Sequence, residues 1–437
     1  MTPITHHPPA AGVLFISEQP LWPLDQGFRV HGYHMATALA QREVTVNVAS
    51  VHPCPNDAPA ALKNLLIDWP TTNSDDVKQF RAGWAGALFN LRHKLAEHQT
   101  LDVQQLAGII PLVKQCQPQM VIGLGQHSPI MLRGLRTNSS VGRIWYAADE
   151  PVYFHLSCLR RDHPYVMPHR LRKMALYATL EALFVRGLEG AIGVSPLDSQ
   201  LLRIVAGARR TITIRNGVDL DYFNPQPPNT NPLSPNTKSL IFWGCMDFEP
   251  NVDAVCWFAQ KVWPKLRCLR PDATWQIVGK NPSPRVTALN RIPGIEVVGQ
   301  VEDIRPYVHA AAVTIIPTRC GGGIKNKLLE AAAMARPILV SPRAIRGLDL
   351  SRGDRPVIVA RSSQQWVESI RRLWADAPYA RRLGQTARRW VEINHSWSAA
   401  ATTLSHWLAT FPNISRPSHQ IQSTKWPTST IANREAA

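Results

Sequence analysis

The sequence predicts an α/β protein built from two facing Rossmann-like domains. Three observations lead to this fold class: a βαβ pattern opens the chain, a second series of alternating strands and helices follows it, and a segment rich in Pro and Asn separates the two. With 437 residues, of which 45% are hydrophobic, the chain is long enough to bury two cores of ordinary size.

The first series begins with a short apolar strand at 13–17, a glycine turn leading into a helix at 33–41, and an alternating strand at 44–48. Such an opening is typical of a parallel doubly wound sheet. The later elements keep the same rhythm, with helices expected at 102–116, 168–187 and 196–206 and strands at 120–124, 143–147, 190–194 and 211–215. We therefore expect a first domain over 12–222, after a flexible N-terminus of residues 1–11.

The second series follows a linker at 223–238, where Pro and Asn are too frequent for a regular element. Its expected strands are 239–243, 274–278, 295–298, 313–317 and 337–341, and its expected helices are 251–265, 304–311, 325–334 and 363–376. A second domain is thus predicted over 239–385. A helix at 380–410, with Trp397 bracing the hinge, is expected to return toward the first domain over 386–411, and 412–437 is expected to be a disordered tail.

Composition excludes several classes of protein. No apolar run reaches the roughly 18 residues of a transmembrane helix, and Met1–Pro9 lacks the apolar region of a secretory signal. The seven cysteines include no C-x-x-C pair, which fits a reduced cytoplasmic protein better than a disulfide or zinc scaffold.

The formal charge of +17 suits an anionic partner: nucleic acid, a membrane surface or a polyphosphate substrate. No nucleic-acid-binding motif accompanies it, so no nucleic acid is expected, and a solvated Arg-rich surface is the plain alternative. The densest basic stretch, 160–173, leads into the apolar run 174–185. This arrangement predicts peripheral contact with an anionic membrane at its inner face.

One stretch reads as an anion cradle. Gly321, Gly322 and Gly323 close a strand and let the backbone approach a ligand, and the helix that follows turns its free N–H groups toward the loop. Lys325 and Lys327 add positive charge, and the Glu330 carboxylate suits sugar hydroxyls. A phosphate-bearing sugar nucleotide fits both ends of this stretch. An ordinary strand-to-helix turn with Glu330 as a surface carboxylate remains the alternative.

In open α/β sheets ligands bind beyond the carboxyl ends of the strands. His127 follows a strand as a hydrogen-bond donor or proton shuttle, or else as a structural histidine. Asp149 and Glu150 either bind acceptor hydroxyls and orient a base, or form a turn before Pro151. Asp219 and Asp221 fit an Asx-type turn better than a metal site. The other residues at expected strand ends are Gly27, Gln126, Asn216, Gly217, Gly244, Gly279 and Lys280.

Five segments together resemble the GT-B glycosyltransferases of the group 1, glycogen-synthase-like kind, and most closely the sugar transferases of bacterial exopolysaccharide clusters. The segments are Arg-Asn-Gly-Val-Asp-Leu-Asp-Tyr-Phe-Asn-Pro at 215–225, Asp-Phe-Glu-Pro-Asn-Val-Asp-Ala at 247–254, Ile-Val-Gly at 277–279, Val-Gly-Gln-Val-Glu-Asp at 298–303, and the glycine-rich Lys-x-Lys-x-x-Glu run ending at 330. The resemblance covers about residues 12–405 in order and is specific in the C-terminal half.

The resemblance implies a nucleotide-sugar donor held mainly by the second domain, a glycan or lipid-linked acceptor held by the first, and transfer with retention without metal or cofactor. Glu330 would hold the ribose, and the amides of 321–323 with Lys325 or Lys327 the diphosphate. The loop at 300–303, which ends on Asp303, would run alongside the base of the donor nucleotide. The other residues assigned to the site are Gly27, His127, Asp149, Asn216, Gly244, Lys280, Arg319 and Asn326, with His127, Asp149 and Lys327 in catalytic roles.

Two departures from the family pattern concern the donor. The first carboxylate of the Glu-x7-Glu motif, which grips the donor sugar, falls here on Gly322, and the Arg and Lys common after the first strand of the second domain are missing from 244–249. Phosphate charge must then be met by Lys325, Lys327, Lys280 or Arg319.

The resemblance predicts a glycosyltransferase of cell-surface polysaccharide biosynthesis. A GT-B-type sugar-nucleotide epimerase and a degenerate, non-catalytic glycan-binding or assembly protein are the rival hypotheses.

Overall fold

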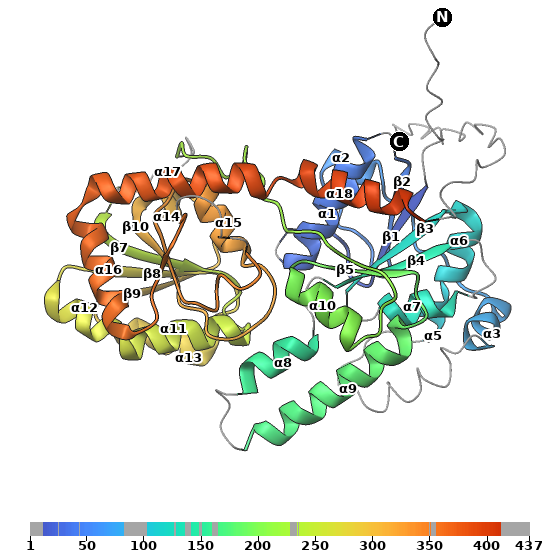
Figure 1. Ribbon diagram of the computed structural model, residues 1–437, viewed down its shortest axis with the longest axis horizontal. Coiled ribbons are helices and arrows are strands. Elements are labelled where there is room, and N and C mark those ends of the chain that lie inside the picture. The colour runs from blue at the N-terminus through green and yellow to red at the C-terminus, as the bar shows by residue number, and fades with distance from the viewer. Residues whose placement is uncertain are drawn as a thin grey trace, which may run out of the picture.

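The chain forms two α/β domains that lie side by side and are joined by two crossings (Figure 1). The computed structural model describes residues 12–24, 26–42, 44–82, 103–125, 128–135, 141–147, 151–159, 165–227, 234, 236–348, 350 and 355–411. The predicted fold class, with two facing Rossmann-like domains, is confirmed.

The first domain is a six-stranded parallel sheet with strand order β2-β1-β3-β4-β5-β6. Its strands are β1 (Val13–Ser17), β2 (Val46–Ser50), β3 (Met120–Leu124), β4 (Gly142–Ala147), β5 (Gly190–Gly193) and β6 (Thr211–Thr213). Its helices are α1 (Gly27–Ala40), α2 (Ala60–Lys63), α3 (Ser74–Ala82), α5 (Val103–Ala107), α6 (Ile109–Cys116), α7 (Ser128–Gly134), α8 (Pro151–Leu159), α9 (Met167–Val185) and α10 (Pro196–Ile204).

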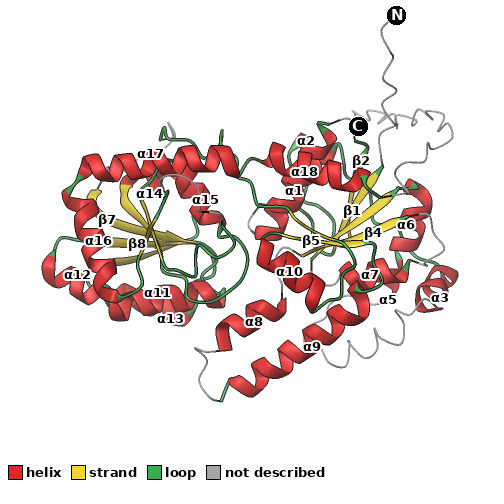
Figure 2. Cartoon of the chain, in the orientation of Figure 1, coloured by secondary structure: helices red, strands yellow, loops and turns green. Residues whose placement is uncertain are grey.

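The second domain has the strand order β12-β11-β10-β7-β8-β9, again all parallel. Its strands are β7 (Asn236–Trp243), β8 (Thr274–Val278), β9 (Ile295–Gly299), β10 (Ala311–Ile316), β11 (Ile338–Val340) and β12 (Ile358–Val359). Its helices are α11 (Glu249–Lys261), α12 (Trp263–Leu269), α13 (Pro284–Thr287), the 3-10 turn η1 (Ala288–Arg291), α14 (Arg305–Ala310), α15 (Asn326–Ala333), α16 (Ser363–Ala375) and α17 (Ala377–Asn394). Figure 2 shows helices covering both faces of each sheet.

The strands are buried on both faces, which explains why they read as continuous apolar runs rather than alternating ones. Every residue of β1, β3 and β4 is buried, and aromatic side chains fill the second core, where Phe258 packs against Trp275 with ring centroids 4.8 Å apart. Each domain therefore contains its own apolar core on either side of its sheet.

The C-terminal helix expected at 380–410 consists of two helices. α17 stays on the second domain, where Trp390 and Val391 join its core, and α18 (Trp397–Ala409) packs on the first domain against α1. The break falls at His395 and Ser396, because Ser396 accepts the N–H of Ala399 and starts a new helix. The chain therefore returns to the first domain at these residues rather than at 386.

Other expected elements also differ in detail from the structure. The helices expected at 102–116 and 251–265 are each split in two, at Gly108 and at Val262 before Pro264. β7 starts at Asn236, inside the expected linker. The short helices α2, α7 and α8 follow loops and lack the long amphipathic pattern that identifies a helix from sequence.

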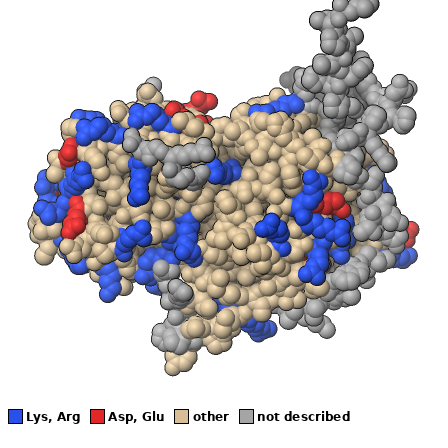
Figure 3. Space-filling model, viewed as in Figure 1, with Lys and Arg blue, Asp and Glu red and all other residues tan. Residues whose placement is uncertain are grey.

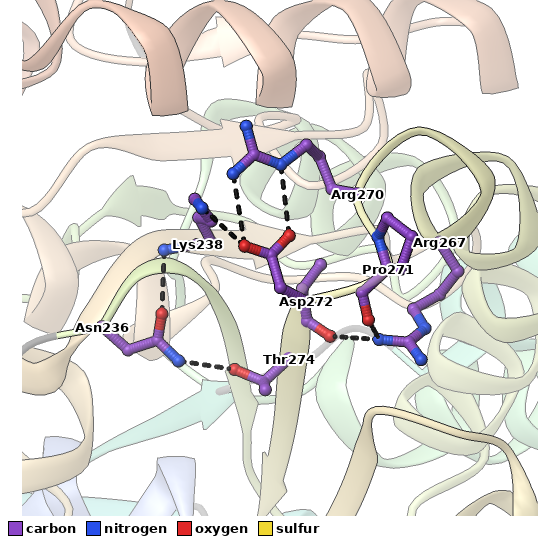
Figure 4. A network of polar contacts seen from close by, with 8 residues as sticks. Asn236, Lys238, Arg267, Arg270, Pro271, Asp272 and Thr274 are labelled. Atoms are coloured by element: carbon purple, nitrogen blue, oxygen red, sulfur yellow. Dashed lines mark hydrogen bonds and ion pairs between the residues drawn. The ribbon is translucent and has the colours of Figure 1, made fainter.

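A polar network ties together the amino ends of β7 and β8 (Figure 4). Asp272 accepts from Lys238 at 2.5 Å and from Arg270 at 3.2 Å, and these partners hold the pKa of its carboxyl well below the ordinary range. Asn236 joins the strands by donating to Thr274 at 3.0 Å. Because β7 and β8 are parallel, this network lies at the amino ends of the strands. Ligands bind at the opposite, carboxyl ends.

The surface carries the positive charge that the composition requires. Lys and Arg side chains are spread over both domains on the face shown in Figure 3, where Asp and Glu are few. Among the helices of the described ranges, none is both long enough and apolar enough to cross a membrane.

Candidate functional site

The candidate site lies where the strand order of the second sheet reverses. β7 is flanked by β8 on one side and by β10 on the other, so the loops that leave β7 and β10 diverge at their carboxyl ends. Such a switch point is where open α/β sheets bind ligands. The loop after β7 begins with Gly244, and the loop after β10 carries the glycine run and leads into α15.

Two glycines let the backbone pack closely at this edge. Gly279 has φ +149°, and a Cβ placed on it would lie 1.7 Å from the carbonyl oxygen of Gly244, so no larger residue fits. Gly244 has φ +141°, and its Cβ would lie 3.0 Å from Nζ of Lys327. The predicted site residue Gly244 thus leaves room for the side chain of Lys327 in α15.

Lys327 extends from the first turn of α15 toward the end of β7. Its Nζ donates to Oδ1 of Asn251 at 2.9 Å and lies 3.9 Å from the ring centroid of Phe242. Burial, with the nearby charge of Lys325, lowers the pKa of Lys327 to about 7, although Glu330 opposes the shift. The side chain is thus about half protonated near pH 7, and a bound anion would raise its pKa.

Glu330 lies one turn further along α15. Its Oε2 accepts a hydrogen bond from the indole N–H of Trp243 at 2.7 Å. Burial raises the pKa of this carboxyl, and the bond from Trp243 and the charge of Lys327 counteract it. Within the part of the chain that the structure describes, Oε1 accepts no hydrogen bond, so it is available to a ligand hydroxyl.

The glycine loop is already partly occupied by protein groups. The N–H of Gly321, expected to face a ligand, donates to Oγ of Ser157 in α8 at 2.7 Å, and Lys325 donates back to the carbonyl of Gly322. Gly321 and Gly323 have φ of +92° and +64°, which side chains other than glycine adopt only with strain. The amides of Gly322 and Gly323 donate no hydrogen bond within the described residues.

The N-termini of α1 and α15 face each other across the two domains. Asn216 donates to Oδ1 of Asn326 at 2.8 Å, and a Cβ placed on Gly27 would lie 3.8 Å from Nδ2 of Asn326. No side chain caps either helix. Because the N-terminal N–H groups carry partial positive charge, both helices favour an anion between them. The structure therefore brings together Gly27, Asn216 and Asn326, which the sequence assigns to one site.

Three other predicted residues are held by protein partners. Arg319 forms a bidentate ion pair with Asp253 in α11, with N–O distances of 2.9 and 2.5 Å, and its guanidinium is therefore directed at α11. Asp303 accepts from Arg305 at 2.8 Å, and Arg305 also lies 3.9 Å from the ring centroid of Tyr222. Lys280 follows β8, where its carbonyl accepts the N–H of Met246 at 2.8 Å.

Several predicted residues lie outside the described ranges. These are Gln126, His127, Asp149 and Glu150. Their chain neighbours end β3 and β4, on the side of the first sheet that faces the second domain. Within the described residues no group of three or more His, Cys, Asp or Glu is close enough together to hold a metal ion.

Sequence reasoning missed the contacts that α8 and α9 make with the second domain. Arg170 of α9 forms an ion pair with Glu249 at 2.5 Å, and the rings of Phe154 and Phe248 stack with centroids 5.9 Å apart. Tyr153 accepts a hydrogen bond from Arg346 at 2.8 Å. No sequence signal pairs these residues, because each contact joins segments far apart in the chain.

Comparison with known proteins is consistent with this geometry. Residues 237–376 match the model of the family Glycosyl transferases group 1. That range runs from the second residue of β7 past the end of α16 and contains every described site residue of the second domain. Among curated proteins, none matches the sequence.

Solved structures share the fold of the whole chain. Sucrose-phosphate synthase from Thermosynechococcus elongatus superimposes with a TM-score of 0.66 at 15% identity, over 91% of this chain and 98% of that one. HepE of Anabaena, in complex with UDP and glucose, has a TM-score of 0.60 at 14% identity, over 93% and 100%. WaaG, a glycosyltransferase involved in lipopolysaccharide biosynthesis, has a TM-score of 0.57 at 16% identity, over 91% and 100%.

Proposed function

We propose that this chain, whose second domain matches the family Glycosyl transferases group 1 and whose two domains have the fold of the solved glycosyltransferases, moves a sugar from a nucleotide diphosphate to a glycan or lipid-linked acceptor. The observation that carries the proposal is the convergence of Lys327, Glu330 and the glycine loop at the switch point of the second sheet. HepE and TarM, which share the fold, were solved with UDP, and this supports a nucleotide donor here.

In the proposed donor complex, the free Oε1 of Glu330 accepts hydrogen bonds from the ribose hydroxyls, while Trp243 holds Oε2. The diphosphate lies against the amides of Gly322 and Gly323 and the ammonium of Lys327. The N-terminus of α1, on the opposite side, adds further positive potential around the diphosphate. The acceptor enters from the first domain, where the sequence places His127 and Asp149.

The chemistry of the proposed reaction depends on charge. As the glycosidic bond to the donor breaks, negative charge develops on the departing diphosphate, and preorganised N–H groups and lysines stabilise it. The charge that a divalent metal would otherwise supply comes from Lys325, Lys327 and the two helix N-termini. We therefore propose transfer without a metal. From the family resemblance we also propose retention of configuration and a role in cell-surface polysaccharide biosynthesis.

Substituting Glu330 by Gln is expected to weaken UDP binding by about ten- to a hundredfold, because hydrogen bonds to a charged acceptor contribute about 1.5–3 kcal/mol. An amide oxygen still accepts from Trp243, so the fold should be retained. The measurement is the rise in melting temperature on adding UDP or GDP, followed by calorimetric titration.

Glu368→Gln, an exposed substitution on α16, is the matched control and should bind like wild type. If neither UDP nor GDP protects the wild type, or if Glu330→Gln binds as tightly as wild type, the assignment of the donor site is wrong.

The rival reactions give different products. An epimerase would convert a UDP-sugar to its epimer with no acceptor present, whereas the proposed transferase needs an acceptor. A screen of nucleotide sugars against a lipid-linked acceptor extract, followed by mass spectrometry, identifies the donor and separates the two. The family match favours the transferase.

We also propose that the tip formed by the end of α8 and the start of α9 contacts an anionic membrane carrying the acceptor. Tyr165 is 87% exposed there, and Leu156 and Leu171 are each 48% exposed. The basic residues Arg172 and Lys173 adjoin this apolar tip. Apolar side chains beside basic ones match the interface of an anionic bilayer.

Replacing both Tyr165 and Leu171 by Ser is expected to reduce cosedimentation with vesicles containing phosphatidylglycerol, because the apolar anchor is lost. Ile393→Ser is the matched control, since Ile393 is 78% exposed on α17 of the other domain. Equal binding to phosphatidylcholine vesicles, or unchanged binding of the double variant, would contradict the membrane proposal.

A further inference from the structure

Two buried cysteines meet where the domains touch. Cys158 lies near the end of α8 and Cys320 in the glycine loop, with exposed fractions of 1% and 2%. The thiols lie close enough that each shifts the pKa of the other. The adjoining residues also pair, because the N–H of Gly321 donates to Oγ of Ser157 at 2.7 Å, and this oxygen lies 3.8 Å from Sγ of Cys158.

The two thiols differ in acidity. Interaction with Cys320, and to a smaller extent with Ser157, lowers the pKa of Cys158 to about 7, whereas interaction with Cys158 and burial raise the pKa of Cys320. Burial raises the pKa of Cys54, Cys116 and Cys256. A more acidic thiol beside a second thiol that can resolve it is one feature of reversible thiol switches.

We propose that Cys158 and Cys320 form a reversible disulfide between the domains when the protein meets a hydroperoxide. The Cys158 thiolate attacks the O–O bond and takes up a hydroxyl group, while the other oxygen leaves as water or an alcohol. The Cys320 sulfur then displaces the hydroxyl group as water and closes the S–S bond. Two thiols are oxidised and one hydroperoxide is reduced, and no other reactant is needed.

The disulfide would hold α8 on the glycine loop. The N–H of Gly321 already bonds to Ser157 of α8, and the same two domains are joined nearby by the Arg170–Glu249 ion pair and by the bond from Arg346 to Tyr153. Because the link would hold Cys320 and Gly321 against α8, it would restrict the approach of a donor diphosphate to the neighbouring amides of Gly322 and Gly323. This consequence for donor binding rests on the proposed function; the disulfide itself does not.

The test is peptide mapping after treatment of the reduced protein with hydrogen peroxide and alkylation of the remaining thiols. Trypsin releases Cys158 in the peptide 144–160 and Cys320 in the peptide 320–325. We expect these two peptides to appear linked, two hydrogens lighter than their sum, and to separate on reduction with dithiothreitol. Recovery of both cysteines in alkylated form, or linkage of either to another cysteine, overturns the proposal.

Cys158→Ser and Cys320→Ser should each abolish the linked pair, whereas Cys268→Ser, at an exposed cysteine, should retain it. Because the wild-type map identifies the bond directly, the result stands even if a serine variant folds poorly. In wild type, thermal protection by UDP should fall in proportion to the oxidised fraction and return with dithiothreitol. A protein that forms the disulfide but never binds UDP would refute the proposed function and leave the disulfide in place.

Discussion

Raising the pH from 7 to 9 is expected to weaken UDP binding by up to about a hundredfold, because a binding ammonium with a pKa near 7 loses its proton in the free protein over this range. The sign follows from linkage. The diphosphate stabilises the charged form of Lys327 and raises its pKa in the complex, so binding takes up a proton above pH 7 and becomes weaker by about tenfold per pH unit.

The measurement is calorimetric titration with UDP in two buffers of different ionisation enthalpy at pH 8. Uptake of nearly one proton per UDP is expected, and the affinity should be the same with and without EDTA. Lys327→Met should bind UDP about ten- to a hundredfold more weakly at pH 7 and lose the pH dependence, since a charge-assisted contact is removed.

Lys265→Met, an exposed position on α12, is the matched control and should keep both the affinity and the pH dependence of wild type. A pH profile that is the same in Lys327→Met and wild type would show that another group titrates. Loss of binding in EDTA would instead point to a metal and contradict the proposed charge balance.

Lowering the pH from 7 to 5 is expected to cost about 4 kcal/mol of unfolding free energy through two histidines at the crossings between the domains. Nε2 of His31 is hydrogen-bonded to the Tyr146 hydroxyl at 2.6 Å, and Nδ1 of His395 lies 2.7 Å from the carbonyl oxygen of Asn216. Burial, with His34 nearby, lowers the pKa of His31 to about 3, and burial lowers that of His395 to about 4.

The sign again follows from proton binding. Both imidazoles are neutral in the folded chain at pH 5, whereas in the unfolded chain they titrate near pH 6.5 and bind protons below it. Stability is therefore complete above pH 6.5 and is lost as the pH falls toward the folded pKa values. At pH 5 each histidine contributes a loss of about 2 kcal/mol, from about 1.4 kcal/mol per pH unit.

Urea unfolding followed by tryptophan fluorescence at pH 7 and pH 5 measures this loss. The double variant His31→Gln/His395→Gln should be less stable at pH 7 but lose much less between the two pH values. His406→Gln, an exposed substitution on α18, should behave like wild type. An unchanged acid loss in the double variant would assign it to other groups.

Most of the fold could be predicted from sequence because its signals are local. Buried parallel strands read as short apolar runs, and the strands expected at 13–17, 120–124 and 274–278 have the same bounds in the structure. The split at Gly108 and the new start at Ser396 were missed, because helix ends depend on single caps that a long amphipathic pattern conceals.

The candidate site was predictable in part for the same reason. The glycines, Lys327 and Glu330 fall within one continuous stretch, so their order along the chain already places them on one loop and one helix. Their partners are distant: Trp243 holds Glu330, Asn251 holds Lys327, and Asp253 holds Arg319. The sequence offers Arg319 as a phosphate ligand, because its ion pair with Asp253, 66 positions away, cannot be read from spacing along the chain.

The sequence by itself determined the two α/β domains, the linker region between them and the anion cradle after β10, since periodicity and glycine placement act over a few residues. Only the tertiary structure decided that α8 covers the glycine loop, with Ser157 against Gly321 and Cys158 against Cys320. These residues are more than a hundred and sixty positions apart in the chain. Such contacts depend on how two independent cores pack, and no local pattern records that packing.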